Sequence, residues 1–240
     1  MTYSLAHART YWHHIPSGLG KHDSRELLQL DDAEFLKLWQ RAFDARIIAV
    51  PGELLYVMRA LHRMTPGKRL LSIGPGMGFH EVLFALGGMK VSCQDLVSAN
   101  MAVVYRAARL LGTKIAEVFI VLNPLLLPFD HFWMWGVLMH MPASEREELF
   151  CHLGRLSHSG STLTVMAYTQ KYARECAEPN NPEVFGRYSD PSVDGLDNPW
   201  SEWFDIQRME SLAGEQWQVK QVDYLQDGRF AVWLLHRRIS

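Results

Sequence analysis

Residues 68–81 read Lys-Arg-Leu-Leu-Ser-Ile-Gly-Pro-Gly-Met-Gly-Phe-His-Glu, and this stretch decides how the chain folds. Leu70 to Ile73 form a short apolar run, which is typical of a buried strand. Three alternating glycines follow, and residues without a Cβ atom can adopt positive φ and let a ligand approach the backbone closely. Phe79 to Leu86 have the pattern of a helix, whose first amide groups point towards the turn. The stretch therefore predicts a strand, a tight turn and a helix.

A carboxylate follows the next predicted strand. Lys90 to Gln94 have the pattern of a second buried strand, and Asp95 stands directly after it. An acid at this place in a βαβ unit can accept hydrogen bonds from the ribose hydroxyls of a bound nucleotide. The turn and Asp95 therefore predict a site for a nucleoside-containing cofactor, and we assign the neighbouring Leu96 to the same site.

The composition is that of an ordinary globular chain of 240 residues, with 48% hydrophobic residues and a formal net charge of -2. Such a chain can bury one substantial core. It lacks the clustered Lys and Arg that nucleic-acid binding needs, and no segment has the length of a membrane span. Residues 1–9 lack the apolar run of a signal peptide. Cys93, Cys151 and Cys176 are too widely spaced for a disulfide framework or a zinc set. We expect a cytoplasmic protein without a nucleic-acid, membrane or metal partner; the sequence leaves its oligomeric state open.

Helices and strands are predicted to alternate after Asp95. The pattern gives a helix at 98–111, strands at 117–122 and 131–138, a helix capped by Ser144 and closed at Gly160, and a strand at 161–167. Two further strands, 216–225 and 229–237, flank Asp227-Gly228, which is a strong hairpin signal. The alternation predicts an α/β fold with a seven-stranded, mostly parallel sheet, helices on both faces and a C-terminal antiparallel hairpin.

Two regions lie outside this alternation. Residues 1–67 are predicted to form a helical N-terminal extension or lid: an irregular arm at 1–22, a helix from Asp23 that restarts at Asp31, and a helix at 52–64. Residues 68–240 form the main domain, with an irregular insertion at about 169–205 on the acceptor side. A long irregular segment with aromatic residues is more typical of a functional element than of disorder. The aromatic residues that could cover a ligand or attach the insertion to the sheet are Tyr188, Trp200, Trp203 and Phe204.

The order of these motifs resembles that of the class I S-adenosylmethionine-dependent methyltransferases. Leu71 to Gly78 match the first motif of that family, although Ser72 replaces the acid often found in its strand, and Asp95 matches the ribose-binding acid. The resemblance covers about residues 68–167, and it implies a Rossmann-like sheet with S-adenosylmethionine as cofactor. The residues that it assigns to cofactor binding are Gly74, Pro75, Gly76, Gly78, Asp95, Leu96 and Asn123.

Two of the implied site residues follow later strands. Asn123 stands where the family often has an acid facing the adenine amino group, and an amide oxygen can still accept from that amine. The stretch Trp135 to Pro142 is similar to the end of the fourth strand in the family, where a histidine commonly faces the cofactor and the acceptor. His140 is therefore the first candidate for a general base, although it can equally hold the loop by hydrogen bonds. The weaker candidates are His13, His14 and Tyr168.

Other uses of the glycine turn fit less well. The dinucleotide fingerprint is Gly-x-Gly-x-x-Gly, but here the third glycine comes one residue early, at Gly78. Tyr168 and Lys171 are separated by two residues, not by the three of a short-chain dehydrogenase.

The resemblance implies methyl transfer from S-adenosylmethionine to an oxygen or nitrogen of a small molecule, such as a sugar or a secondary metabolite. Two alternatives stay open: a methyltransferase acting on protein or RNA, and a non-catalytic binding module with the same fold.

Overall fold

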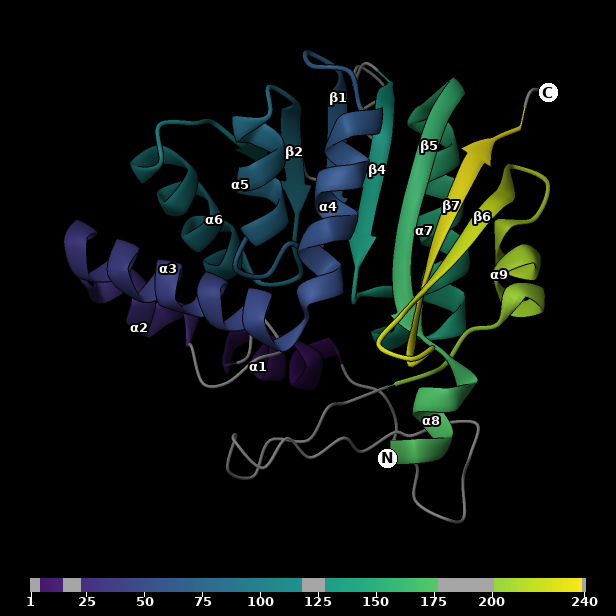
Figure 1. Cartoon of the computed structure of the whole chain (residues 1–240), viewed down its shortest axis with the longest axis horizontal. Helices are drawn as coiled ribbons and strands as arrows, with labels where there is room; N and C mark the ends of the chain where they lie inside the picture. Colours follow the sequence, from purple (N-terminus) through teal and green to yellow (C-terminus); the bar gives the residue numbers. More distant parts are fainter. Residues whose placement is uncertain (1–4, 15–22, 118–127, 177–200, 239–240) are drawn as a thin grey trace.

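The computed structural model describes residues 5–14, 23–117, 128–176 and 201–238 of the chain. Figure 1 shows a central sheet with helices around it. The elements are α1 (Leu5–His14), α2 (Ser24–Gln29), α3 (Asp32–Ala49), α4 (Pro51–Arg63), β1 (Arg69–Ile73), α5 (Phe79–Leu86), β2 (Lys90–Gln94), α6 (Ser98–Leu110), β3 (Ala116–Glu117), β4 (Phe129–Trp135), the 3-10 helix η1 (Leu138–His140), α7 (Ala143–Arg155), β5 (Ser157–Tyr168), α8 (Gln170–Cys176), α9 (Ile206–Ala213), β6 (Trp217–Leu225) and β7 (Phe230–Arg237).

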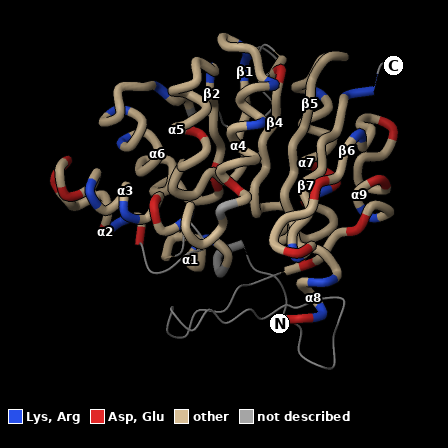
Figure 2. The backbone as a smooth tube through the Cα atoms, viewed as in Figure 1, with Lys and Arg blue, Asp and Glu red and all other residues tan. Residues whose placement is uncertain are grey.

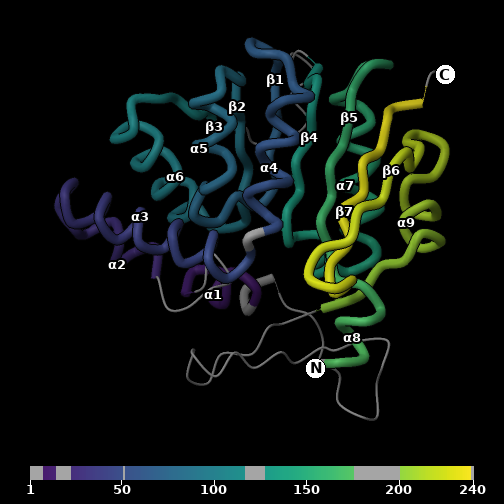
Figure 3. Tube along the Cα trace, viewed as in Figure 1, coloured from purple at the N-terminus to yellow at the C-terminus, as the bar shows by residue number. Residues whose placement is uncertain are grey.

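The sheet is mixed, which confirms the predicted α/β fold. Its strands lie in the order β3-β2-β1-β4-β5-β7-β6 within the described residues. The first five strands in this order pair in parallel, whereas β7 pairs antiparallel with both β5 and β6. The chain turns between β6 and β7 at Gln226 and Asp227, which both have positive φ, and Gly228 follows. Figure 3 shows this pair of strands in yellow, next to β5.

The helices cover the sheet on both faces, with α4 in front and α7 behind it in the view of Figure 1. Tyr56 and Val57 of α4 and Phe150 and Leu153 of α7 are buried in one core that includes the central strands. A second cluster packs α2 and α3 against α5 and α6, around the fully buried Phe35. The helices before β1 are therefore packed onto both the sheet and its helical layer. No helix in the described part of the chain is both long and apolar enough to cross a bilayer.

Acidic caps start the first helices of this layer. Asp23 accepts a hydrogen bond from the amide of Arg25, and Asp31 accepts from the amides of Ala33 and Glu34. Such caps satisfy amide groups that have no partner inside the helix. The prediction of a helix that begins at Asp23 and restarts at Asp31 is confirmed.

The prediction of an irregular arm at 1–22 is wrong for residues 5–14, which form α1. Ala8 and Tyr11 of this helix are 1% and 4% exposed. The apolar pattern of α1 is too weak to be recognised by its period, so packing onto the rest of the molecule stabilises the helix.

Several predicted boundaries are also corrected. Pro142 occupies the N-cap position of α7 without a capping side-chain hydrogen bond, and the helix ends at Arg155. Ser144 therefore lies inside the helix, and Gly160 lies in β5. The fourth strand ends at Trp135 because Gly136, with φ of 74°, turns the chain into η1. Only Ala116–Glu117 form β3, and residues 118–122 of the predicted third strand lie outside the described residues.

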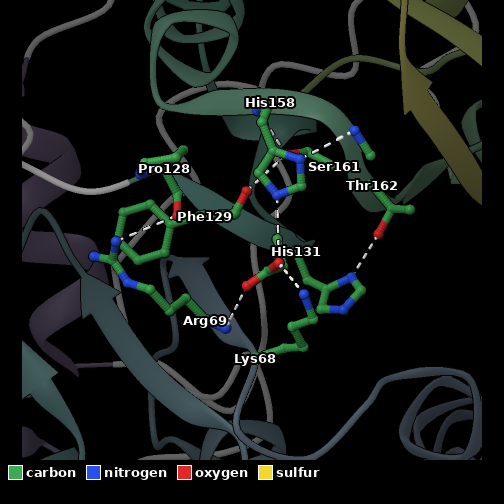
Figure 4. Close-up of polar contacts among 10 residues, drawn as sticks. Lys68, Arg69, Pro128, Phe129, His131, His158, Ser161 and Thr162 are labelled. Carbon is green, nitrogen blue, oxygen red and sulfur yellow. Dashed lines mark hydrogen bonds and ion pairs between the residues drawn. The ribbon is translucent and has the colours of Figure 1, made fainter.

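A polar cluster joins the amino ends of three strands, at the edge opposite the glycine turn (Figure 4). The carboxylate of Asp130 accepts from Nζ of Lys68 at 3.0 Å, from the amide of Arg69 at 2.8 Å and from Nε2 of His158 at 3.3 Å. Beside it, Nδ1 of His131 and Oγ1 of Thr162 are 2.8 Å apart. Burial alone would raise the pKa of Asp130, but these hydrogen bonds outweigh burial and lower it. The cluster therefore holds β1, β4 and β5 in register.

Replacing Asp130 by Asn should lower the free energy of unfolding by about 1 kcal/mol at pH 7, since the charged hydrogen bonds are lost. A carboxyl group with a lowered pKa stabilises the fold above its unfolded-state pKa and loses this effect as the pH falls. The difference between wild type and Asp130→Asn should therefore shrink as the pH falls below the ordinary value of 3.8. Urea unfolding across pH measures this, with exposed Asp44→Asn as the control. Equal stability at pH 7 would contradict it.

Candidate functional site

The glycine turn after β1 has a backbone that only glycines accommodate easily. Gly74, Gly76 and Gly78 have φ of 65°, 56° and 75°. A Cβ atom at Gly74 would lie 2.5 Å from Cγ2 of Val137, and one at Gly78 would lie 2.8 Å from Cγ2 of Val104. Both distances are too short for carbon atoms. The turn therefore fits tightly between the chain after β4 and helix α6.

Asp95 lies beside this turn. Its Oδ2 accepts a hydrogen bond from the amide of Gly76 at 3.3 Å, and its Oδ1 accepts from the amide of Val97 at 2.8 Å and from Nδ2 of Asn100 at 3.3 Å. Burial outweighs these hydrogen bonds and raises the pKa of Asp95 to about 6. The neighbouring Leu96 is 38% exposed. A partly buried carboxylate therefore stands at the end of β2, next to the bend in the backbone.

The turn and His140 lie on either side of the point where the strand order reverses. β1 pairs with β2 on one side and with β4 on the other, so the turn after β1 and the 3-10 helix after β4 meet at the carboxyl edge of the sheet. Ligands of open α/β sheets bind in the crevice at such a point. The predicted residues Gly74, Pro75, Gly76 and Asp95 are thus brought together at this crevice, across from His140.

His140 is 8% exposed and is surrounded by aromatic rings. Its ring centre lies 4.8 Å from that of Trp12 in α1 and 5.7 Å from that of Tyr168 at the end of β5. Its Nδ1 lies 3.3 Å from Oγ of Ser201. The weaker candidate Tyr168 therefore touches His140, whereas His14 is paired with Asp23 at 2.9 Å.

The remaining predicted residues fall into two groups, those outside the described residues and those that pack the chain. Asn123, Tyr188 and Trp200 are outside the described residues. Trp203 packs on Ala173 and under the guanidinium group of Arg208, and Phe204 packs against Trp233. Both rings are buried. These two aromatic residues therefore attach the chain to the sheet.

The structure supplies a carboxyl group that the sequence pattern did not assign. Oγ of Ser72, in β1, donates to Oε1 of Glu81 at 2.6 Å, and Glu81 is 3% exposed. Burial raises the pKa of Glu81. A buried carboxyl group from the start of α5 thus lies beside Ser72 in β1. The sequence could have suggested this pair, because Ser72 and Glu81 are only nine residues apart and stand on either side of the glycine turn, which folds α5 back onto β1.

A second buried network fixes the start of α5. Nε1 of Trp133 donates to Nδ1 of His80 at 3.2 Å, and Nε2 of His80 contacts Oε1 of Glu53 at 2.7 Å. Because an indole N–H only donates, Nε2 carries the proton that Glu53 accepts. Arg46 pairs with the same carboxylate at 2.8 Å. Burial alone would raise the pKa of Glu53, but the partners lower it to about 2. Helices α3 and α4 are therefore bonded to the helix after the turn.

Substituting Ala for Gly74 should destabilise the fold by more than the same change at Gly112, which has φ of 75° but open space around its Cα. Both variants carry the strain of left-handed backbone, about 1–2 kcal/mol, and only Gly74→Ala adds the contact with Val137. Thermal and urea unfolding of both variants gives the difference. Val137→Ala should reduce the additional cost at Gly74. Equal losses at the two glycines would contradict the close approach of β1 and β4.

Comparison with known proteins identifies which fold the chain has. No protein-family model and no curated protein sequence matches the chain. Among solved structures it is similar to a SAM-dependent methyltransferase from Methanosarcina mazei, with 20% identity, a TM-score of 0.63 and coverage of 75% of this chain and 98% of that one. The N-methyltransferase NodS from Bradyrhizobium japonicum, in complex with S-adenosyl-L-homocysteine, has 11% identity and a TM-score of 0.57 over 78% of this chain and 86% of its own. A putative O-methyltransferase from Nostoc punctiforme has 13% identity and a TM-score of 0.56, over 83% and 60%. The chain therefore has the fold of the S-adenosylmethionine-dependent methyltransferases.

Proposed function

We propose that this protein is a cytoplasmic methyltransferase that uses S-adenosylmethionine. The observation that carries the proposal is the contact between Asp95 and the amide of Gly76, at the crevice where the strand order reverses. In this proposal Asp95 accepts hydrogen bonds from the ribose hydroxyls, because a carboxylate is the stronger acceptor for such donors. Leu96, next to Asp95 and partly exposed, would contact the nucleoside of the donor, and the glycines keep side chains away from the turn.

The acceptor in this proposal is an oxygen or a nitrogen of a small molecule, such as a sugar or a secondary metabolite. In the backbone trace of Figure 2, the positions of basic and acidic residues are interspersed along the described chain, and this does not favour a nucleic-acid acceptor, because such binding needs clustered basic residues. Two of the similar structures are named for the atom that is methylated: one is an N-methyltransferase and the other a putative O-methyltransferase.

The chemistry requires the acceptor, the methyl carbon and the sulfur to be in line. S-adenosylmethionine supplies a methyl group activated by a sulfonium. The protein's contribution is to hold the two molecules in this geometry, and most of the acceleration comes from positioning. For a hydroxyl acceptor, His140 takes the proton as general base, and Oγ of Ser201 lies within reach of its Nδ1 to orient the ring. Neutral amines need no such base.

Asp95→Asn should weaken binding of S-adenosylhomocysteine about tenfold or more at pH 8, because a charged acceptor is lost. The wild-type carboxyl group, with a pKa of about 6, is ionised above that pH and protonated below it. Wild-type affinity should therefore fall as the pH decreases through 6, whereas the affinity of Asp95→Asn should change little. Isothermal titration calorimetry between pH 5 and 8 measures both.

The control for this titration is Asp44→Asn, at an exposed site in α3, which should bind like wild type. A wild-type protein that binds neither S-adenosylmethionine nor S-adenosylhomocysteine, or that binds NAD instead, would contradict the proposed function. Unchanged affinity in Asp95→Asn would contradict the role given to Asp95.

His140→Ala should reduce turnover of a hydroxyl acceptor by roughly 10²- to 10⁴-fold, since the general base is lost. Turnover of amine acceptors should fall less, because neutral amines need no general base. The measurement is the release of S-adenosylhomocysteine with panels of hydroxylated and amine-containing small molecules. If turnover of hydroxyl acceptors is unchanged across pH, His140 holds the loop and is not a base.

A further inference from the structure

Asn100 in α6 connects Asp95 to the first helix. It is 1% exposed, and its side-chain amide donates to Oδ1 of Asp95 and to the backbone carbonyl of Trp12, both at 3.3 Å. Its Oδ1 accepts from Oγ of Ser24, which also lies 3.5 Å from the carbonyl of His13. A primary amide has two hydrogens and one oxygen, so Asn100 uses both hydrogens and its oxygen in this network. A buried network with these groups satisfied specifies one arrangement of its members.

The first helix extends from this network to the acceptor side of the crevice. The ring of Trp12 packs against His140, with 4.8 Å between ring centres. Figure 1 shows α1 at the edge of the sheet where β4 ends, which is also the edge of the glycine turn. A single residue of α1 therefore touches both sides: its carbonyl is bonded to the partner of Asp95, and its side chain touches the candidate base.

We propose that Asn100 is a positioning residue for the proposed methyl transfer. Asn100 couples occupation of the Asp95 site to the docking of α1 across the crevice. This inference rests on the proposed function. Asp95 would hold the donor hydroxyls while it accepts from Asn100, Asn100 keeps its second hydrogen on the Trp12 carbonyl, and Trp12 packs against His140. The helix therefore closes the acceptor side when the donor is present.

The coupling between donor binding and docking of α1 can be measured from either side, because thermodynamic linkage makes it reciprocal. If donor binding favours the docked position of α1, docking must favour donor binding by the same factor. Loss of the Asn100 amide unlinks α1 from the Asp95 site, and a coupling between sites of this kind corresponds to roughly a tenfold change in affinity. Loss of the Ser24 hydroxyl leaves the hydrogen bond between Asn100 and Asp95 in place and loosens only the third arm of the network. Ser24→Ala should therefore have the smaller effect.

Hydrogen exchange of the wild-type protein with and without S-adenosylhomocysteine tests the coupling. The backbone amides of α1 should exchange more slowly when the ligand is bound, by about the same factor by which docking favours the ligand. If the wild type binds S-adenosylhomocysteine and exchange in α1 is unchanged, the inference is overturned while the proposed function stands. If no binding occurs, the proposed function itself fails.

Three variants separate coupling from folding. Asn100→Ala should bind S-adenosylhomocysteine about tenfold more weakly and lose the ligand-dependent protection of α1, and Ser24→Ala should show a smaller loss of both. Ser98→Ala, at the exposed first residue of α6, should match wild type in both measurements. Asn100→Ala that keeps wild-type affinity and protection would overturn the inference. If Asn100→Ala does not fold, two other comparisons decide the question. The inference is overturned if the ligand does not slow exchange of α1 in the wild type, or if the ligand protects α1 in Ser24→Ala as strongly as in the wild type.

Discussion

The backbone at Gly74 passes so close to Val137 that no side chain fits between them, and the rest of the site depends on this approach. β1 and β4 are neighbours in the sheet, so the approach brings the turn after one strand against the segment after the other. The turn leads into the helix whose first amides face the crevice, and the segment after β4 leads into His140. A single steric constraint thus sets the spacing between the two sides of the crevice.

Buried polar networks hold the parts around this constraint. Glu53 bonds to His80 at the start of α5, Glu81 bonds to Ser72 in β1, and Asn100 bonds to Asp95. Each pair joins two different elements, and each has at least one buried member. An unpaired polar group in such a place costs free energy, so these pairs favour one relative position of the elements. The orientation of α5 and the place of the Asp95 carboxylate follow from them.

The strand order also explains how Asp95 and His140 can lie on two sides of one edge of the sheet. The strand order reverses between β1 and β4, and open α/β sheets bind their ligands at such a point. One side carries Asp95, a carboxyl group whose burial favours its neutral form. The other carries His140 in a setting of aromatic rings. At the opposite edge, Asp130 ties the amino ends of β1 and β4 and the start of β5.

The sequence by itself determined the local elements at the centre of the fold. The predicted helix Phe79 to Leu86 and strand Lys90 to Gln94 coincide with α5 and β2, because an apolar run, a glycine turn and a helix start are encoded by neighbouring residues. Only the tertiary structure decided that residues 5–14 form a helix, and that Asn100 reaches the carbonyl of Trp12. These features arise from contacts between residues far apart in the chain, and a local pattern carries no information about which distant partner the sheet order brings into reach.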